Sequence, residues 1–281
     1  MNAPQASHLP VSEATFQRLR AFLARRIGVE LGADRGYLVR NRLGPVLDSF
    51  GLRDFDSLVL ALERQSTPAL TDAVVDAMTT HETLWFRDRY PFDVLAQHVL
   101  PERWRAGRAL RVWSAACSTG QEAYSLAITL DEYRLARAAC REHTYEVLGT
   151  DVSPAALREA ERGVYDRHTG VRGLAPALLA RHFERQRDGW RVRPDVRRAV
   201  RFRRFNLLDD PGGLGVFDVV FLRNVLIYFG AEAQRSLLQR VVTCLAPGGW
   251  LVLGTAETVG GDSTGLLLPR RLGGGVIYQR A

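Results

Sequence analysis

The chain has 281 residues, of which 46% are hydrophobic and 25% charged, a balance typical of a globular protein with a buried core. All 38 basic residues are arginine and they outnumber the 31 acidic residues, so the formal charge is +7 and the partner could be nucleic acid or an acidic protein surface. No apolar run approaches the roughly 20 residues that cross a bilayer, and the first residues lack the apolar segment of a signal peptide. We therefore expect a cytoplasmic protein with no direct membrane insertion.

The three cysteines are too few and too scattered for a disulfide framework, and they suggest no metal site; they are Cys117, Cys140 and Cys244.

The first part of the chain is predicted to be helical, because its apolar residues recur at three- and four-residue spacing over residues 12–80. Capping residues mark where these helices begin and end. Four helices are expected: one between Ser12 and Gly28, one near residues 34–50 that Gly44-Pro45 can break in two, one near residues 56–65, and one that begins at Thr67-Pro68.

From about residue 109 onward, short apolar runs alternate with helical patterns, which predicts a parallel sheet with crossover helices. The expected strands are 109–116, 145–151, the start of 217–229, the run after the Pro-Gly-Gly turn at 247–249, and 275–280. In such a sheet, ligands bind at the carboxyl ends of the strands.

The stretch VWSAACSTGQEAYS (112–125) predicts a strand, a tight turn and the start of a helix. A dinucleotide fingerprint needs three glycines in such a loop, whereas this one has only Gly120. Glu122 in the first helical turn would repel a phosphate, so NAD and ATP are poor candidates, and it would suit a cationic or amino group. Asp151, at the end of the next strand, is well placed to accept both ribose hydroxyls of an adenosine. Together they favour S-adenosylmethionine; alternatively, both carboxylates simply cap helices.

The chain also resembles a known family. MTTHETLWFRDRYPF (78–92), RVWSAACSTGQEAYSLAITL (111–130) and FDVVFLRNVLIYF (217–229) resemble motifs of the chemotaxis receptor methyltransferases of the CheR type, and the motifs at 149–165, 206–209 and 245–258 follow in family order. The resemblance implies a Rossmann-like class I methyltransferase: an α/β fold with a mostly parallel seven-stranded sheet, a small N-terminal helical domain and a small antiparallel β-subdomain insertion. The expected boundaries are 1–80 for the helical domain, 81–108 for a linker helix that contacts the cofactor, and 109–281 for the catalytic domain, with the β-subdomain at about 183–205.

The resemblance further implies a reaction, the transfer of the methyl group of S-adenosylmethionine to receptor glutamates as γ-methyl esters. It assigns cofactor contacts to His81, Thr83 and Arg87 from the linker helix, to Glu122 and Asp151, to Asn206 and Leu207 around the adenine, and to Asn224 and Val225 under the methionine part. Arg87 and Tyr228 would face the transferring methyl group and the acceptor carboxylate. His81 stands where the family usually has asparagine.

Receptor recognition is assigned to arginines of the helical domain, with Arg25 and Arg26 as the candidates, because residues 16–42 hold seven arginines against two acidic residues. Some family members dock a C-terminal receptor peptide on the β-subdomain through a longer loop; the short loop at Asp188-Gly189 argues against such docking here. Two alternatives remain. A nucleic-acid methyltransferase would explain the arginines, although the sequence has no Asn-Pro-Pro-Tyr type motif and no nucleic-acid partner is expected. A non-catalytic module that binds S-adenosylmethionine would explain the cofactor loop.

Overall fold

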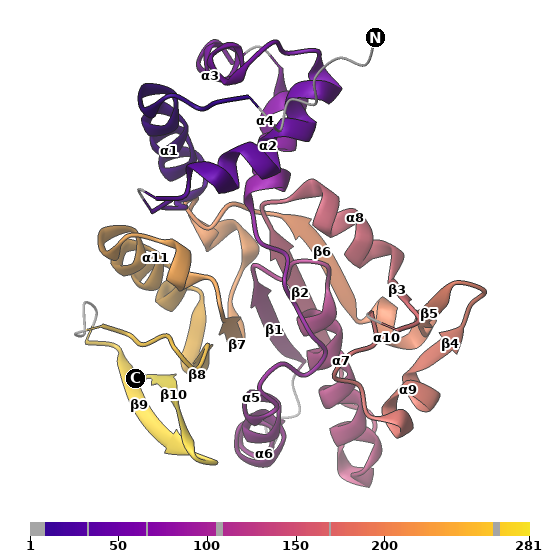
Figure 1. Ribbon diagram of the computed structural model, residues 1–281. Helices are drawn as coiled ribbons and strands as arrows, with labels where there is room; N and C mark the ends of the chain where they lie inside the picture. Colours follow the sequence, from indigo (N-terminus) through magenta and orange to yellow (C-terminus); the bar gives the residue numbers. More distant parts are fainter. Residues whose placement is uncertain (1–8, 33, 66, 105–108, 169, 261–264) are drawn as a thin grey trace.

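A computed structural model describes residues 9–32, 34–65, 67–104, 109–168, 170–260 and 265–281. The chain forms a group of helices standing on the edge of an α/β region (Figure 1). The helical part contains α1 (Glu13–Ile27), α2 (Gly36–Phe50), α3 (Phe55–Glu63) and α4 (Pro68–Met78). None of the helices in the described part of the chain is both long and apolar enough to cross a membrane.

The caps expected at the ends of these helices are present. Ser12 Oγ accepts a hydrogen bond from Thr15 N at the start of α1, and Gly28 ends that helix with a φ of 75°. Thr67 caps α4, with Pro68 in its first turn. The expected break at Gly44-Pro45 is wrong, because α2 continues through it. Residues on both sides of this pair are buried in the helical core, and that packing outweighs the local cost of a proline.

The main sheet has seven strands, β1 (Leu110–Ala115), β2 (Tyr145–Asp151), β6 (Val200–Arg204), β7 (Phe217–Leu222), β8 (Leu245–Leu253), β9 (Leu267–Leu272) and β10 (Gly275–Arg280). Their order is β6-β2-β1-β7-β8-β10-β9, and the first five run parallel while β10 is antiparallel to both of its neighbours. This arrangement confirms the Rossmann-like methyltransferase fold. The sequence did not predict β9, and the Pro-Gly-Gly stretch lies inside β8.

Helices cover both faces of this sheet. One face carries α7 (Gln121–Leu135), α8 (Pro154–Arg162) and the short helices α5 (Tyr90–Val94) and α6 (Leu100–Arg103), which a π-helical turn (Leu95–Val99) joins. The other face carries α11 (Ala231–Thr243) and the 3-10 turn Pro211–Leu214. The chain also has 3-10 turns at Ala138–Cys140 and Leu226–Tyr228.

The prediction of a linker helix over residues 81–108 is wrong for its first part. Residues 81–89 are extended or in turns, and helical structure starts only at Tyr90. Tertiary contacts hold this segment outside a helix: Trp85 Nε1 donates to Gly170 O at 2.7 Å, and Phe86 N donates to Ser125 Oγ at 3.1 Å. Any contact of His81, Thr83 and Arg87 with a ligand therefore comes from an extended segment and a turn.

The β-subdomain also differs from its expected bounds. It is a three-stranded antiparallel sheet in the order β3-β5-β4, built from β3 (Val164–Asp166), β4 (Phe183–Arg185) and β5 (Gly189–Val192), with α9 (Pro176–His182) inserted. The hairpin turn at Asp188-Gly189 is present. After α10 (Pro194–Arg198), however, the chain enters β6, which pairs in parallel with β2 as the edge of the main sheet. The antiparallel unit thus begins near residue 164 and ends near 192.

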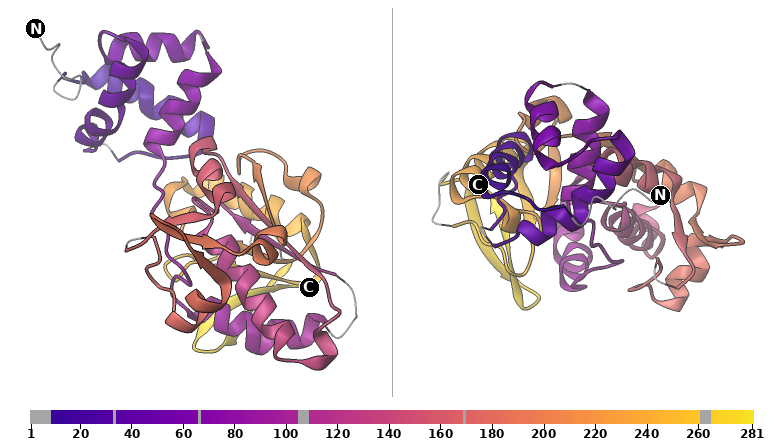
Figure 2. Two further views of the ribbon diagram at one scale, coloured as in Figure 1. Left: turned by 90° about the vertical axis from the view of Figure 1, so that its right-hand side faces the viewer. Right: turned by 45° about the horizontal axis from the view of Figure 1, so that its top comes forward.

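The helical part lies over the carboxyl ends of the parallel strands, and the right-hand view of Figure 2, in which the top of the molecule is turned toward the reader, shows it in front of them. Three contacts from different strand ends hold it there. Ser153 Oγ donates to Asp76 Oδ1 at 2.5 Å, Asn206 Nδ2 to Arg26 O at 2.7 Å, and Glu30 N to Tyr228 O at 2.9 Å. The carboxyl edge of the sheet, where a ligand is expected, therefore has a helical roof.

Candidate active site

A cavity lies between the helical part and the ends of β1, β2 and β7. Ile27, Val29 and Met78 line it from the helical side. Every residue predicted to bind cofactor or to act in catalysis lines this same cavity: His81, Thr83, Arg87, Glu122, Asp151, Asn206, Leu207, Asn224, Val225 and Tyr228. Arg25 and Arg26 do not; they line an adjoining groove between α1, α4 and the end of β6, which shares Ile27 and Asn206 with the cavity.

The turn after β1 is tightly wound, which lets the backbone approach the cavity. Ala116, Ser118 and Gly120 have φ values of 60°, 51° and 96°, all in the left-handed region that favours glycine. A Cβ on Gly120 would lie 2.9 Å from Ala160 Cβ, so glycine is required there for packing as well. Cys117 lines the cavity in the same turn, but burial raises the pKa of its thiol well above the usual value, so Cys117 is not a thiolate at neutral pH.

Asp151 is a buried carboxylate at the end of β2, with 7% of the residue exposed. Its Oδ2 accepts a hydrogen bond from Ser118 N at 2.8 Å and its Oδ1 accepts one from Ser153 N at 2.9 Å. Burial raises the pKa of Asp151 above its ordinary value, and these backbone bonds only partly oppose the rise. Each carboxylate oxygen keeps a second acceptor position, so Asp151 can receive two further donors from the cavity.

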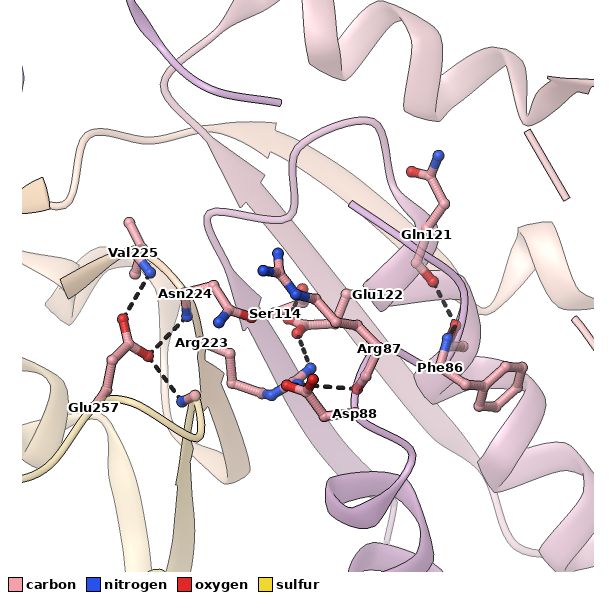
Figure 3. Close-up of polar contacts among 12 residues, drawn as sticks. Phe86, Arg87, Asp88, Ser114, Gln121, Glu122, Arg223, Asn224, Val225 and Glu257 are labelled. Atoms are coloured by element: carbon pink, nitrogen blue, oxygen red, sulfur yellow. Dashed lines mark hydrogen bonds and ion pairs between the residues drawn. The ribbon is translucent and has the colours of Figure 1, made fainter. Parts of the chain in front are cut away.

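Glu122 does not stand alone in the first turn of α7, as Figure 3 shows. Its Oε1 accepts from Ser114 Oγ at 2.7 Å, and its Oε2 accepts from Arg223 Nη1 at 2.9 Å. The other arm of the Arg223 guanidinium donates to Asp88 Oδ2 at 2.7 Å and to Arg87 O at 2.9 Å. Only 1% of the Arg223 side chain is exposed, so this fork is a buried ionic link between β7, α7 and the turn that carries Arg87.

The segment before α5 brings the remaining predicted residues to the cavity rim. His81 Nε2 lies 2.9 Å from Thr79 Oγ1, and His81 O accepts from Ser118 Oγ at 3.3 Å. Arg87 Nη1 donates to Glu82 O at 3.1 Å. Around Arg87 the backbone is strained, because Phe86, Asp88 and Arg89 have φ values of 48°, 66° and 46°.

Two loops complete the cavity at the ends of β6 and β7. Asn206 is half-buried and its side chain is engaged within the protein, since Oδ1 accepts from Leu208 N at 3.1 Å while Nδ2 bonds to Arg26 O. The loop after β7 contains Asn224 with a φ of 56°, followed by Val225 and the 3-10 turn that carries Tyr228. A residue beyond the cavity wall, Glu257, accepts hydrogen bonds from the backbone of this loop.

Comparison with known protein families shows which family the chain belongs to. The CheR methyltransferase all-alpha domain matches residues 14–79, and the CheR methyltransferase SAM-binding domain matches residues 81–267. The chain belongs to the CheR methyltransferase family. Chemotaxis protein methyltransferase 1 of Pseudomonas aeruginosa is 44% identical over 254 residues, which cover 89% of this chain and 92% of that protein. Chemotaxis protein methyltransferase Cher2 of Pseudomonas putida is 43% identical over 249 residues, covering 88% and 90%. The Vibrio parahaemolyticus relative is 39% identical over 272 residues, covering 96% and 98%.

S-adenosylmethionine is therefore the cofactor of this CheR protein, and the cavity fits it chemically. A carboxylate with free acceptor positions, Asp151, suits the ribose hydroxyls, and apolar side chains such as Leu207 suit a flat aromatic base. Glu122 also lines the cavity, and its carboxylate is paired with Arg223, whose Nη1 donates to Oε2 at 2.9 Å. Within the described residues, no group of three or more histidine, cysteine or acidic side chains could hold a metal ion.

Sequence reasoning missed two residues that organise this CheR site, Arg223 and Glu257. Both lie inside motifs that carry the family resemblance, Arg223 within residues 217–229 and Glu257 within residues 245–258. For Arg223 the available signal was a charged side chain directly after the apolar run VVFL (219–222), because a buried charge requires a partner. Glu257 lies four residues after β8 and carries no such signal. The partners come from distant parts of the chain, which the sequence alone does not reveal.

Proposed function

We propose that this cytoplasmic enzyme transfers the methyl group of S-adenosylmethionine to glutamate side chains on the cytoplasmic helices of chemoreceptors, forming γ-glutamyl methyl esters. The names of the three relatives support a chemotaxis substrate. The observation that carries the proposal is that Arg87 and Tyr228 line the same cavity as Asp151. A guanidinium and a phenol can bind an acceptor carboxylate by charge-assisted hydrogen bonds.

The reaction requires positioning more than acid–base chemistry. S-adenosylmethionine supplies an electrophilic methyl group on a sulfonium that is already a good leaving group. A glutamate side chain, with an ordinary pKa near 4.3, is ionised at neutral pH and needs no base to remove a proton. Arg87 and Tyr228 would orient its oxygen, and the helical roof would exclude water, which makes this proximity catalysis.

The proposal is tested by the chemistry of the product. The protein is incubated with methyl-labelled S-adenosylmethionine and, in separate reactions, with receptor cytoplasmic fragments or with RNA. We expect label in the receptor fragment alone, and we expect mild base to release it as methanol because carboxyl esters hydrolyse. Base-stable label in RNA would instead establish the nucleic-acid alternative, and cofactor binding without any transfer would establish the non-catalytic module.

A second prediction concerns Arg25 and Arg26 in the last turn of α1, which we propose as contacts for the acidic receptor helices. Reversing both charges, with Arg25→Glu and Arg26→Glu, should raise the KM for the receptor and reduce its dependence on salt. Their side chains lie outside the cofactor cavity, so cofactor affinity should stay the same. Unchanged receptor kinetics at low ionic strength would exclude this surface and point to the arginines at 191–204.

A further inference from the structure

Glu257 is a buried carboxylate that, among the residues the structure describes, accepts hydrogen bonds from backbone amides alone: three in the loop after β7 and that of Gly254. Glu257 is 8% exposed and follows β8 by four residues. Its Oε1 accepts from Val225 N and Leu226 N, both at 2.8 Å. Its Oε2 accepts from Asn224 N at 2.7 Å and from Gly254 N at 2.8 Å. Figure 3 shows this carboxylate facing the loop after β7, on the side away from Arg87.

The four hydrogen bonds use every acceptor position of the carboxylate, because each oxygen offers two. In the described part of the chain, no arginine or histidine forms an ion pair with Glu257, so backbone N–H groups stabilise its charge. Bonds of this kind are stronger than those between neutral groups. The cluster is also closely packed, since a Cβ on Gly254 would lie 2.6 Å from Glu257 Oε2 and 2.9 Å from Asn224 Nδ2.

The loop that Glu257 holds has a conformation that it would not adopt freely. Asn224 has a φ of 56°, and such left-handed residues cost about 1–3 kcal/mol unless their surroundings fix them. The amides of Asn224, Val225 and Leu226 all point to one carboxylate, and this curls the chain into the 3-10 turn Leu226–Tyr228. Asn224, Val225 and Tyr228 then face the cavity, which Glu257 itself does not line.

We propose that Glu257 is a positioning residue for methyl transfer: it fixes the loop that presents Asn224 and Val225 to the cofactor and Tyr228 to the acceptor. This assignment rests on the proposed function for the role of Tyr228. Glu257 acts on the site through its hydrogen bonds to the backbone of this loop, because its own side chain does not line the cavity. The charge matters as much as the shape, because only a carboxylate offers four acceptor positions in this plane.

The test is Glu257→Gln, which keeps the shape and removes acceptors. One oxygen becomes an NH₂ group that faces two N–H donors, so two backbone amides lose their partner. We expect kcat/KM to fall on the order of 10- to 100-fold, because small displacements of positioned groups have large effects. The Kd for S-adenosylhomocysteine should also rise. Independently of activity, the amide protons of Asn224, Val225, Leu226 and Gly254 should exchange faster with solvent.

Asp218→Asn is the matched control. Asp218 is a buried carboxylate near the start of β7, at the opposite end of that strand from the site, and it accepts from Arg103 Nη2 at 2.6 Å and from Arg111 N at 3.0 Å. Both variants should lower the Tm, but Asp218→Asn should leave the cofactor Kd and the kcat unchanged. If the two variants lower Tm equally and both leave Kd and kcat at wild-type values, Glu257 has only a structural role and the proposal is wrong.

A third variant covers the case in which Glu257→Gln does not fold. Glu257→Asp keeps the charge but shortens the side chain by one methylene group. We expect kcat/KM, the cofactor Kd and the amide exchange to change in the same directions by smaller factors. Wild-type values for all three would overturn the proposal. The cofactor Kd and the amide exchange do not involve the receptor. A failure of the proposed glutamate chemistry would therefore appear in the wild-type product and leave these two readouts intact.

Discussion

Replacing Asp151 with alanine should weaken the binding of S-adenosylmethionine by about 100- to 10,000-fold. The expected loss comes from two hydrogen bonds between ribose hydroxyls and a carboxylate, each contributing roughly 1.5–3 kcal/mol, at about 1.4 kcal/mol for each tenfold change in affinity. Titration calorimetry measures the effect directly. The variant also leaves Ser118 N and Ser153 N without their partner, so thermal unfolding must show that it is folded at the temperature of the titration. Near-normal affinity in a folded variant would remove Asp151 from the binding site.

The same residue predicts a pH dependence of cofactor binding. Burial raises the pKa of Asp151 in the free protein. Ribose hydroxyls that donate to the carboxylate favour its ionised form, so the complex forms with the deprotonated residue. Affinity should therefore be constant at neutral pH and fall as the pH drops through this raised pKa, which lies above the ordinary aspartate value of about 3.9. Asp151→Asn cannot titrate, so it should bind weakly with no such acid-side loss. An acid-side loss that persists in Asp151→Asn would mean that another group titrates.

The parts of this molecule that the sequence predicted well are those determined by local pattern. Ser12 and Gly28 frame α1 as expected, since capping depends on the residues next to the helix end. The alternation of strands and helices likewise predicted a parallel sheet, whose topology brings strand ends together. Asp151 and Glu122 accordingly line one cavity although 29 positions separate them.

The errors lie where contacts between distant segments determine the conformation. The turn around Arg87 is held outside a helix by Gly170, Ser125 and Arg223, none of which is near it in sequence. Residues 200–204 fall within the range 183–205 predicted for the antiparallel subdomain, but their parallel pairing with β2 places them in the main sheet. An edge strand rich in arginine, such as β6, also lacks the apolar pattern that would have marked it as part of the core sheet.

Replacing Arg223 with methionine should have the largest effect on both stability and catalysis. Methionine keeps much of the apolar length but removes the buried charge that bonds Glu122, Asp88 and Arg87 O. Glu122 then stays largely buried with Ser114 as its remaining described partner. Breaking a buried ion pair from one side typically costs about 3–5 kcal/mol, because the other charge is left uncompensated. We expect a Tm well below that of the wild type.

The double variant Arg223→Met with Glu122→Gln distinguishes the effect of the uncompensated Glu122 charge from the loss of the Arg223 hydrogen bonds to Asp88 and Arg87 O. It removes the uncompensated anion and should recover much of the lost stability. Arg103→Met gives a matched control, because Arg103 pairs with the buried Asp218 at 2.6 Å, outside the cavity. That variant should lose stability by a similar mechanism and yet, below its own Tm, transfer methyl groups at the wild-type rate.

Catalysis should fall in Arg223→Met even where the protein is folded. Arg223 is one of the residues whose hydrogen bonds hold the strained turn at Phe86, Asp88 and Arg89 in place. Each left-handed residue stores about 1–3 kcal/mol that such contacts must offset. Once the fork is lost, the turn can relax and move Arg87 away from the cavity. We therefore expect kcat to fall on the order of 100-fold or more. Restoring stability with Glu122→Gln should not restore it, because Asp88 and Arg87 O still lack their donor; Glu122→Gln alone, which keeps Arg223, measures the separate effect of changing this predicted cofactor contact. If the double variant regained the wild-type kcat, the fork would serve stability alone, and the position of Arg87 would have to depend on Trp85 and Phe86 and their contacts.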